Sequence, residues 1–138
     1  MGEGGNMVPK SKQTSKKEME TLKLARKLAT YTIHICSNEK NFPKRYRWCL
    51  TGKIVECAVD IGLNVEMANS VLVQTHEDYV LRRNYQTRAL AETYSLNNMI
   101  EISKMVFGIE SDRAAYWSSM VIELQAMIRN WRKSEKAI

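Results

Sequence analysis

Apolar residues recur at steps of three and four through most of the chain, the spacing that gathers them on one face of an α-helix. Four such stretches predict four helices, over about residues 15–36, 43–70, 75–107 and 111–134. The stripe of the second stretch consists of Leu50, Ile54, Cys57, Ile61, Val65, Ala68 and Leu72. The seam of the fourth consists of Ala114, Trp117, Val121, Leu124, Ile128 and Trp131. Alternating steps of three and four are typical of helices that pack at shallow angles, so we expect both tryptophans in the core.

Residues that favour helix ends separate the first two stretches. Proline is favoured at the first helical position, which predicts a helix start at Pro43 with Asn41 as its N-cap. Within the second stretch Gly52 and Gly62 each lower helix propensity by about 1 kcal/mol relative to alanine. Two explanations stay open for them, a close approach between helices or simple tolerance.

The later helix boundaries carry similar signals. Thr75 and Asp78 have the spacing of a capping box, in which side chain and backbone groups bond reciprocally. Gly108 is placed to end the third helix, and Ser111 to act as the N-cap of the fourth.

These patterns predict an all-α protein, an antiparallel up-down four-helix bundle over residues 15–134. No stretch alternates β-branched and polar residues between turns, so no sheet is expected. Residues 1–14, rich in Gly and Lys, predict a disordered, flexible basic arm, and residues 135–138 form a C-terminal tail.

Composition narrows the class of protein. The 138 residues include 21 cations and 15 anions, a net charge of +6 that permits nucleic-acid binding. No apolar run approaches the about 18 residues of a membrane helix, and the N-terminus has no signal-peptide core. Cys36, Cys49 and Cys57 lie within apolar helical patterns, and we interpret them as reduced core residues. We therefore expect a cytoplasmic protein that does not bind a membrane.

Catalytic signatures are missing from the sequence. His34 and His76 are far apart, and neither follows a Glu by three positions, as the di-iron bundles require. There is no phosphate-binding Gly-rich loop. We predict that the protein is not an enzyme and uses no metal or cofactor.

A basic cluster begins the second helix, where Lys44, Arg45 and Arg47 alternate with Tyr46 and Trp48. Cations in a first turn oppose the helix dipole, so helix stability alone does not account for them. Two interpretations stay open: a solvated basic turn, or a surface for phosphates with aromatic rings for stacking.

Further cations form two smaller groups, Arg82, Arg83 and Arg88 in the third helix and Arg129, Arg132 and Lys133 near the C-terminus. Antiparallel topology places the first cluster and the pair Arg82-Arg83 at opposite ends of the bundle. A single bundle would then have separate patches, which an oligomeric ring could join into a belt.

Several short motifs together resemble one family. They are Phe42-Pro43-Lys44-x-x-Arg47, Leu50-x-x-x-Ile54, Ala68-Asn69 and Trp131-x-x-Ser134. Over about residues 18–134 the chain resembles the accessory variability determinant (Avd) proteins of diversity-generating retroelements, relatives of the rRNA intervening-sequence proteins. The intervening-sequence relatives carry Ala-Asn-Ile-Ala-Glu-Gly in the second helix. Residues 66–70 lack this Glu-Gly, which favours the Avd branch.

The resemblance implies a non-enzymatic accessory protein. Avd proteins form ring-shaped homopentamers, bind the retroelement's reverse transcriptase and template-repeat RNA, and support mutagenic copying of adenines; the cDNA is a further candidate ligand. The nine clustered cations named above would form the binding surface. Two alternatives remain, an rRNA-associated four-helix bundle and an oligomeric scaffold without a reverse transcriptase partner.

Overall fold

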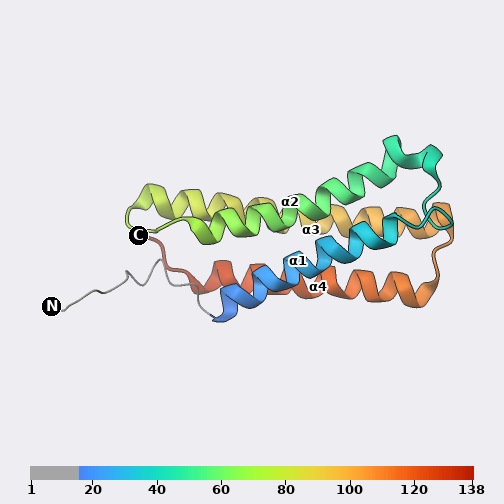
Figure 1. Ribbon diagram of the computed structural model, residues 1–138. Coiled ribbons are helices and arrows are strands. Elements are labelled where there is room, and N and C mark those ends of the chain that lie inside the picture. Colours follow the sequence, from blue (N-terminus) through green and yellow to red (C-terminus); the bar gives the residue numbers. More distant parts are fainter. Residues whose placement is uncertain (1–15) are drawn as a thin grey trace.

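A computed structural model describes residues 16–138 and has four long helices and no strand within that range (Figure 1). The helices are α1 (Lys16–Cys36), α2 (Gly52–Ser70), α3 (His76–Phe107) and α4 (Ser111–Ser134). A short 3₁₀ turn, η2 (Lys44–Tyr46), and a π turn, η3 (Arg47–Thr51), precede α2. The predicted all-α four-helix fold is confirmed. The predicted arm, residues 1–14, lies outside the described residues.

Consecutive helices run in opposite directions (Figure 1). The α1–α2 and α3–α4 connections therefore lie at one end of the bundle, which we call the Trp48 end. The α2–α3 turn and the C-terminus lie at the other, the Glu135 end. The short turns η2 and η3, teal in Figure 1, project at the Trp48 end.

The core lies where the predicted apolar stripes meet. All six residues of the fourth-helix seam are buried, so the prediction for Trp117 and Trp131 is confirmed. Trp117 is fully buried, and its Nε1–H donates a hydrogen bond to Thr32 Oγ1 of α1 at 3.0 Å. Of the second stripe, Ile54, Ile61, Val65 and Ala68 are buried, whereas Leu50, Cys57 and Leu72 are only partly covered.

The start of the second helix differs from the prediction. Asn41 is not its cap: the Asn41 N–H donates to the Asn38 carbonyl within the connection. Pro43 precedes the helical turns in an extended conformation (φ −58°, ψ 143°), and no side chain caps them. The helix also does not run uninterrupted from Pro43, because the first eight residues after it form η2 and η3.

The two glycines of α2 have different explanations. The Gly52 N–H donates to the Arg47 carbonyl five residues earlier, which closes the π turn. A Cβ at Gly52 would lie 3.0 Å from that carbonyl oxygen, so this position favours glycine. A Cβ at Gly62 would have nothing within 4 Å, and glycine there is merely tolerated.

The later helix boundaries follow the sequence more closely. The capping box is confirmed: Thr75 Oγ1 accepts from the Asp78 N–H, and Asp78 accepts from the Thr75 N–H, both at 3.1 Å. Hydrogen bonds from the Gln74 backbone and from Thr75 lower the pKa of Asp78. Gly108 ends α3 in the left-handed region (φ 65°), as predicted. Ser111, by contrast, is the first helical residue of α4, and the cap position falls at Glu110.

The three cysteines do not share one environment. Cys36 is buried and Cys57 half-buried, but Cys49 is exposed, so its assignment to the core is wrong. Burial raises the pKa of the Cys36 thiol to about 12, and burial with the nearby Glu92 carboxylate raises that of Cys57 to about 11. Both thiols are therefore protonated, and poorly nucleophilic, at neutral pH.

The buried seam of α4 predicts a large loss of stability when Trp117 is truncated. Trp117→Ala removes a fully buried indole and its hydrogen bond to Thr32, and should lower the unfolding free energy by about 3–5 kcal/mol in urea titrations. The control is Ile122→Ala on the exposed face of the same helix, which should change the midpoint little. An unchanged midpoint for Trp117→Ala would contradict the seam assignment.

Candidate nucleic-acid interface

An aromatic cluster fixes the chain at the Trp48 end. Phe42 is buried, with its ring centroid 5.2 Å from that of Phe107 in α3 and 6.1 Å from that of Trp117 in α4. Tyr46 also packs edge-on against Phe107, at 5.2 Å. Rings in edge-to-face contact at these distances attract one another beyond their area burial. These contacts of Phe42 and Tyr46 therefore fix the position of the segment 43–48, whose Lys44, Arg45, Arg47 and Trp48 lie at the surface.

The first basic cluster lies on this held segment. Lys44, Arg45 and Arg47 are all exposed. Lys44 pairs with Glu39 at 3.5 Å, but both side chains are more than half exposed, so the pair neutralises little charge in water. The Arg45 guanidinium lies 5.4 Å from the centre of the Tyr46 ring. Trp48 follows, with 89% of its surface exposed.

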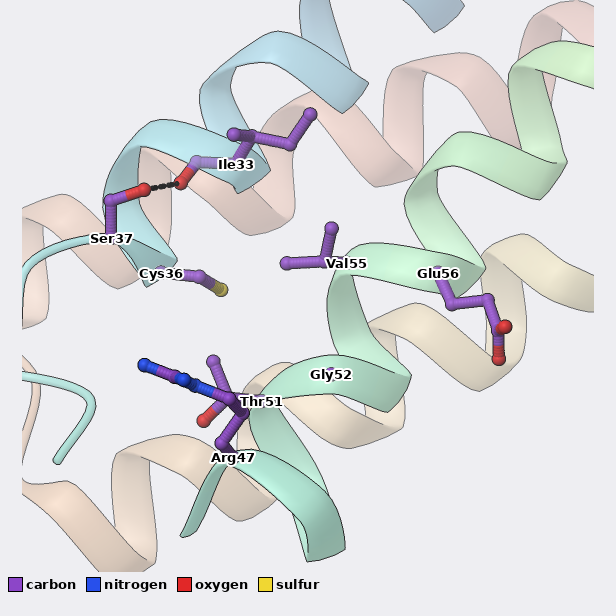
Figure 2. Close-up of a pocket in the computed structure, with 8 residues that line it drawn as sticks. All are labelled: Ile33, Cys36, Ser37, Arg47, Thr51, Gly52, Val55 and Glu56. Carbon is purple, nitrogen blue, oxygen red and sulfur yellow. Dashed lines mark hydrogen bonds between the residues drawn. The ribbon is translucent and has the colours of Figure 1, made fainter. Parts of the chain in front are cut away.

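A groove of about 450 Å³ runs beside the cluster, between the end of α1 and the start of α2 (Figure 2). Ile33, Cys36 and Val55 give it apolar walls, and Ser37 and Thr51 add hydroxyl groups. The Arg47 side chain extends into the groove toward α1 (Figure 2). The π turn η3 forms one side of the groove. Because a π turn holds more residues than an α turn, the side chains after it point in other directions than they would in an uninterrupted α-helix.

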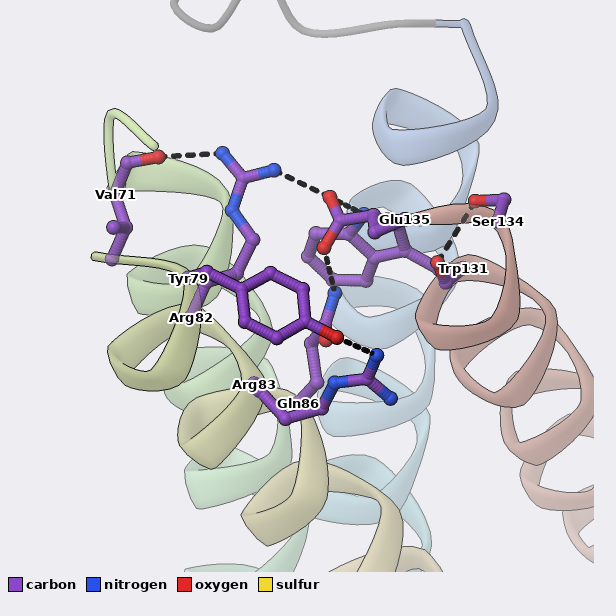
Figure 3. A network of polar contacts seen from close by, with 8 residues as sticks. All are labelled: Val71, Tyr79, Arg82, Arg83, Gln86, Trp131, Ser134 and Glu135. Carbon is purple, nitrogen blue, oxygen red and sulfur yellow. Dashed lines mark hydrogen bonds and ion pairs between the residues drawn. The ribbon is translucent and has the colours of Figure 1, made fainter. Parts of the chain in front are cut away.

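At the Glu135 end, one arginine of the predicted basic surface is buried in an ion pair. Arg82 is buried: one NH group donates to Glu135 Oε2 and the other to the Val71 carbonyl, each at 2.5 Å (Figure 3). Glu135 also accepts from Gln86 Nε2 and from Trp131 Nε1, both at 3.1 Å. Because its guanidinium is occupied inside the protein, Arg82 does not contribute to an exposed basic surface.

The remaining predicted cations lie along α3 and α4. Arg83 is half-buried, donates to the Tyr79 hydroxyl and lies 5.2 Å from that ring's centre. Arg88 is exposed and lies 5.9 Å from the centre of the Tyr85 ring.

At the end of α4 the exposed Arg129 donates to the Tyr94 hydroxyl of α3. Arg132 is partly buried and Lys133 is exposed. Arg83 thus lies at the Glu135 end, away from Lys44, Arg45 and Arg47, as the antiparallel topology predicted (Figure 1). The cations near the end of α4 lie at the Glu135 end too.

Glu135 is the residue that the sequence analysis missed, since it was assigned to the C-terminal tail. It lies just after α4 and accepts bonds from α3 and α4 side chains. No local pattern links it to Arg82, which is 53 positions away. The tail also reaches the α2–α3 turn, where His76 Nδ1 lies 2.6 Å from the Ile138 carbonyl oxygen.

Residues 16–138 contain no group of three or more His, Cys, Asp or Glu side chains placed to hold a metal ion. None of the helices in that range combines the length and the apolarity required to cross a bilayer.

Removing Glu135 should destabilise the protein, because it leaves a buried guanidinium without a counter-charge. We expect Glu135→Ala to lower the unfolding free energy by about 3 kcal/mol. Glu101→Ala is the control, since its ion pair with Lys104 is solvent-exposed and should contribute less than about 1 kcal/mol. Equal urea midpoints for the two variants would show that the Arg82 network is not needed for stability.

Comparison of the chain with protein-family models, with curated proteins and with solved structures gives no match.

Proposed function

We propose that this protein is a non-enzymatic accessory protein of a diversity-generating retroelement. In this role it binds the reverse transcriptase and the template-repeat RNA through basic surface residues and supports mutagenic reverse transcription. The proposal rests on the resemblance of the Phe42-Pro43-Lys44-x-x-Arg47 segment and its neighbours to the Avd proteins, together with the placement of that segment.

One observation carries the proposal: the cations of this segment are exposed while the aromatic residue that precedes them is buried. Phe42 is 2% exposed, whereas Lys44, Arg45 and Arg47 all face solvent. Burial of Phe42 gives the segment a fixed position, so its cations are presented on a rigid support. Exposed cations on a rigid support suit a polyanion, whose phosphates they can neutralise with release of counterions.

The chemistry of the cluster favours phosphate contacts over base reading. Its members carry an ammonium group or a guanidinium group, which bind phosphates. The cluster has no array of Asn or Gln side chains that could read base edges. Binding of this kind depends on salt more than on sequence.

Charge reversal at this cluster is the direct test. Arg45→Glu with Arg47→Glu should weaken binding of the template RNA and of the reverse transcriptase bearing it, while helical content stays unchanged. In gel-shift titrations at several salt concentrations, losing two phosphate contacts should reduce the slope of log affinity against log salt by about 1.4 per engaged protomer on single strands.

The matched control reverses two other exposed cations, Lys23→Glu with Lys27→Glu on α1, and changes the net charge equally. A folded Arg45→Glu/Arg47→Glu protein that binds as tightly as the parent would return these arginines to a role in solubility.

Self-association into a ring, of five copies as the resemblance to the Avd proteins implies, is the second part of the proposal. Its support is the outer face of α3, where eight exposed positions at helical spacing are all uncharged. They are Val80, Asn84, Thr87, Ala91, Tyr94, Asn98, Ile102 and Met105. The exposed face of a bundle helix is ordinarily charged, so an uncharged stripe about 38 Å long suits contact with another copy. A ring would also repeat the weak phosphate contacts of each chain and raise the total affinity.

A carboxylate at the centre of this stripe should separate the copies. Five chains of 15.9 kDa give a particle of about 80 kDa, and Ala91→Glu should reduce the mass measured by light scattering to that of one chain, because burying an unpaired charge is unfavourable. Ala126→Glu, at an exposed position of α4, is the control and should leave the mass unchanged. A wild-type protein that is monomeric at micromolar concentration would contradict the ring itself.

A further inference from the structure

Trp48 is an exception among the three tryptophans. Trp117 and Trp131 are 0% and 2% exposed, whereas Trp48 is 89% exposed. Exposing an indole to water is unfavourable, and within residues 16–138 no other segment covers it. Such a residue is a candidate for contact with a ligand.

The surroundings of Trp48 indicate which kind of ligand. Arg47 precedes it, and Lys44 and Arg45 lie within four positions, all exposed. The other aromatic ring of the segment, Tyr46, is occupied by its contact with Phe107 and by the Arg45 guanidinium over its face. Trp48 is therefore the one ring of residues 44–48 whose faces remain open to a ligand, and it is surrounded by positive charge.

We propose that this segment binds single-stranded nucleic acid, with a base stacked on Trp48 and the backbone phosphates contacted by Lys44, Arg45 and Arg47. This inference rests on the proposed function and names the form of nucleic acid that its basic surface takes. A single strand can turn an unstacked base toward an exposed ring, whereas the faces of bases in a duplex are covered by their neighbours. Because every base has a π face, the contact tolerates any sequence.

The distribution of tryptophans gives the inference a specific readout. With Trp117 and Trp131 buried in the core, changes of intrinsic fluorescence on ligand binding report on Trp48. The full-length protein would be titrated with a short single-stranded RNA and with a duplex of the same length. We expect the single strand to quench the fluorescence and the duplex to leave it unchanged.

Variants then measure the contribution of the ring. Trp48→Ala should bind the single strand about tenfold more weakly, with unchanged affinity for the duplex, and Trp48→Phe should restore part of the lost affinity. The control is Val106→Ala, which removes an exposed apolar side chain at the same end of the bundle but no π face, and should bind as the parent does. Circular dichroism should show the same helical content in all variants, since both side chains lie outside the core.

The outcomes separate this inference from the function on which it rests. If Trp48→Ala binds the single strand as the parent does while Arg45→Glu/Arg47→Glu binds weakly, stacking is overturned and phosphate binding stands. If neither variant changes binding, both proposals fail. If Trp48→Ala instead changes the mass of the particle in light scattering, Trp48 contacts another copy of the chain and the inference is overturned.

Discussion

The burial of Phe42 is the constraint on which the candidate interface depends. Its ring packs against Phe107 of α3 and Trp117 of α4, and Trp117 in turn donates to Thr32 of α1. One aromatic cluster thus joins three helices and anchors the connection that follows α1. Because Phe42 must lie inside and Pro43 continues in an extended conformation, the chain emerges from the core at Lys44.

Arg82 at the Glu135 end and the arginines of the first basic cluster at the Trp48 end lie in opposite environments. At the Glu135 end, Arg82 is buried and its charge is balanced by Glu135, an arrangement that contributes to the fold. At the Trp48 end, Arg45 and Arg47 are exposed, and the ion pair between Lys44 and Glu39 is solvated. Exposed, solvated cations are free to contact the phosphates of a polyanion, so the Trp48 end is the better candidate surface.

The third helix packs in the bundle with one face and exposes an uncharged stripe on the other. Its inner face contributes buried residues such as Ala89, Leu96 and Ile100 to the core, and the exposed stripe of eight positions from Val80 to Met105 is uncharged. Cyclic symmetry places identical parts of each copy at the same level along the ring axis. A ring whose axis runs parallel to the helices would therefore bring all Trp48 ends to one rim, which would repeat the basic segment around it.

Local features of the sequence determined most of the fold. The spacing of apolar residues defined the four helices and the buried seam of α4, because a helix places residues three and four apart on one face wherever it packs. The Thr75–Asp78 capping box and the glycine at 108 were equally predictable, since each depends on bonds within a few residues. The position of the first basic cluster at the end of the bundle opposite Arg82-Arg83 followed from antiparallel topology alone.

Tertiary structure decided what the sequence pattern left open. Arg82 and Arg83 are neighbours in one cluster, yet Arg82 is buried because Glu135 returns from the end of α4 to pair with it. The π turn before α2, the cap position at Pro43 in place of Asn41 and the exposure of Cys49 were not predicted from the spacing of apolar residues either. Helix periodicity is a local property that can be read along the chain. The burial of a single cation depends on partners up to 53 positions away, and only the folded chain brings them together.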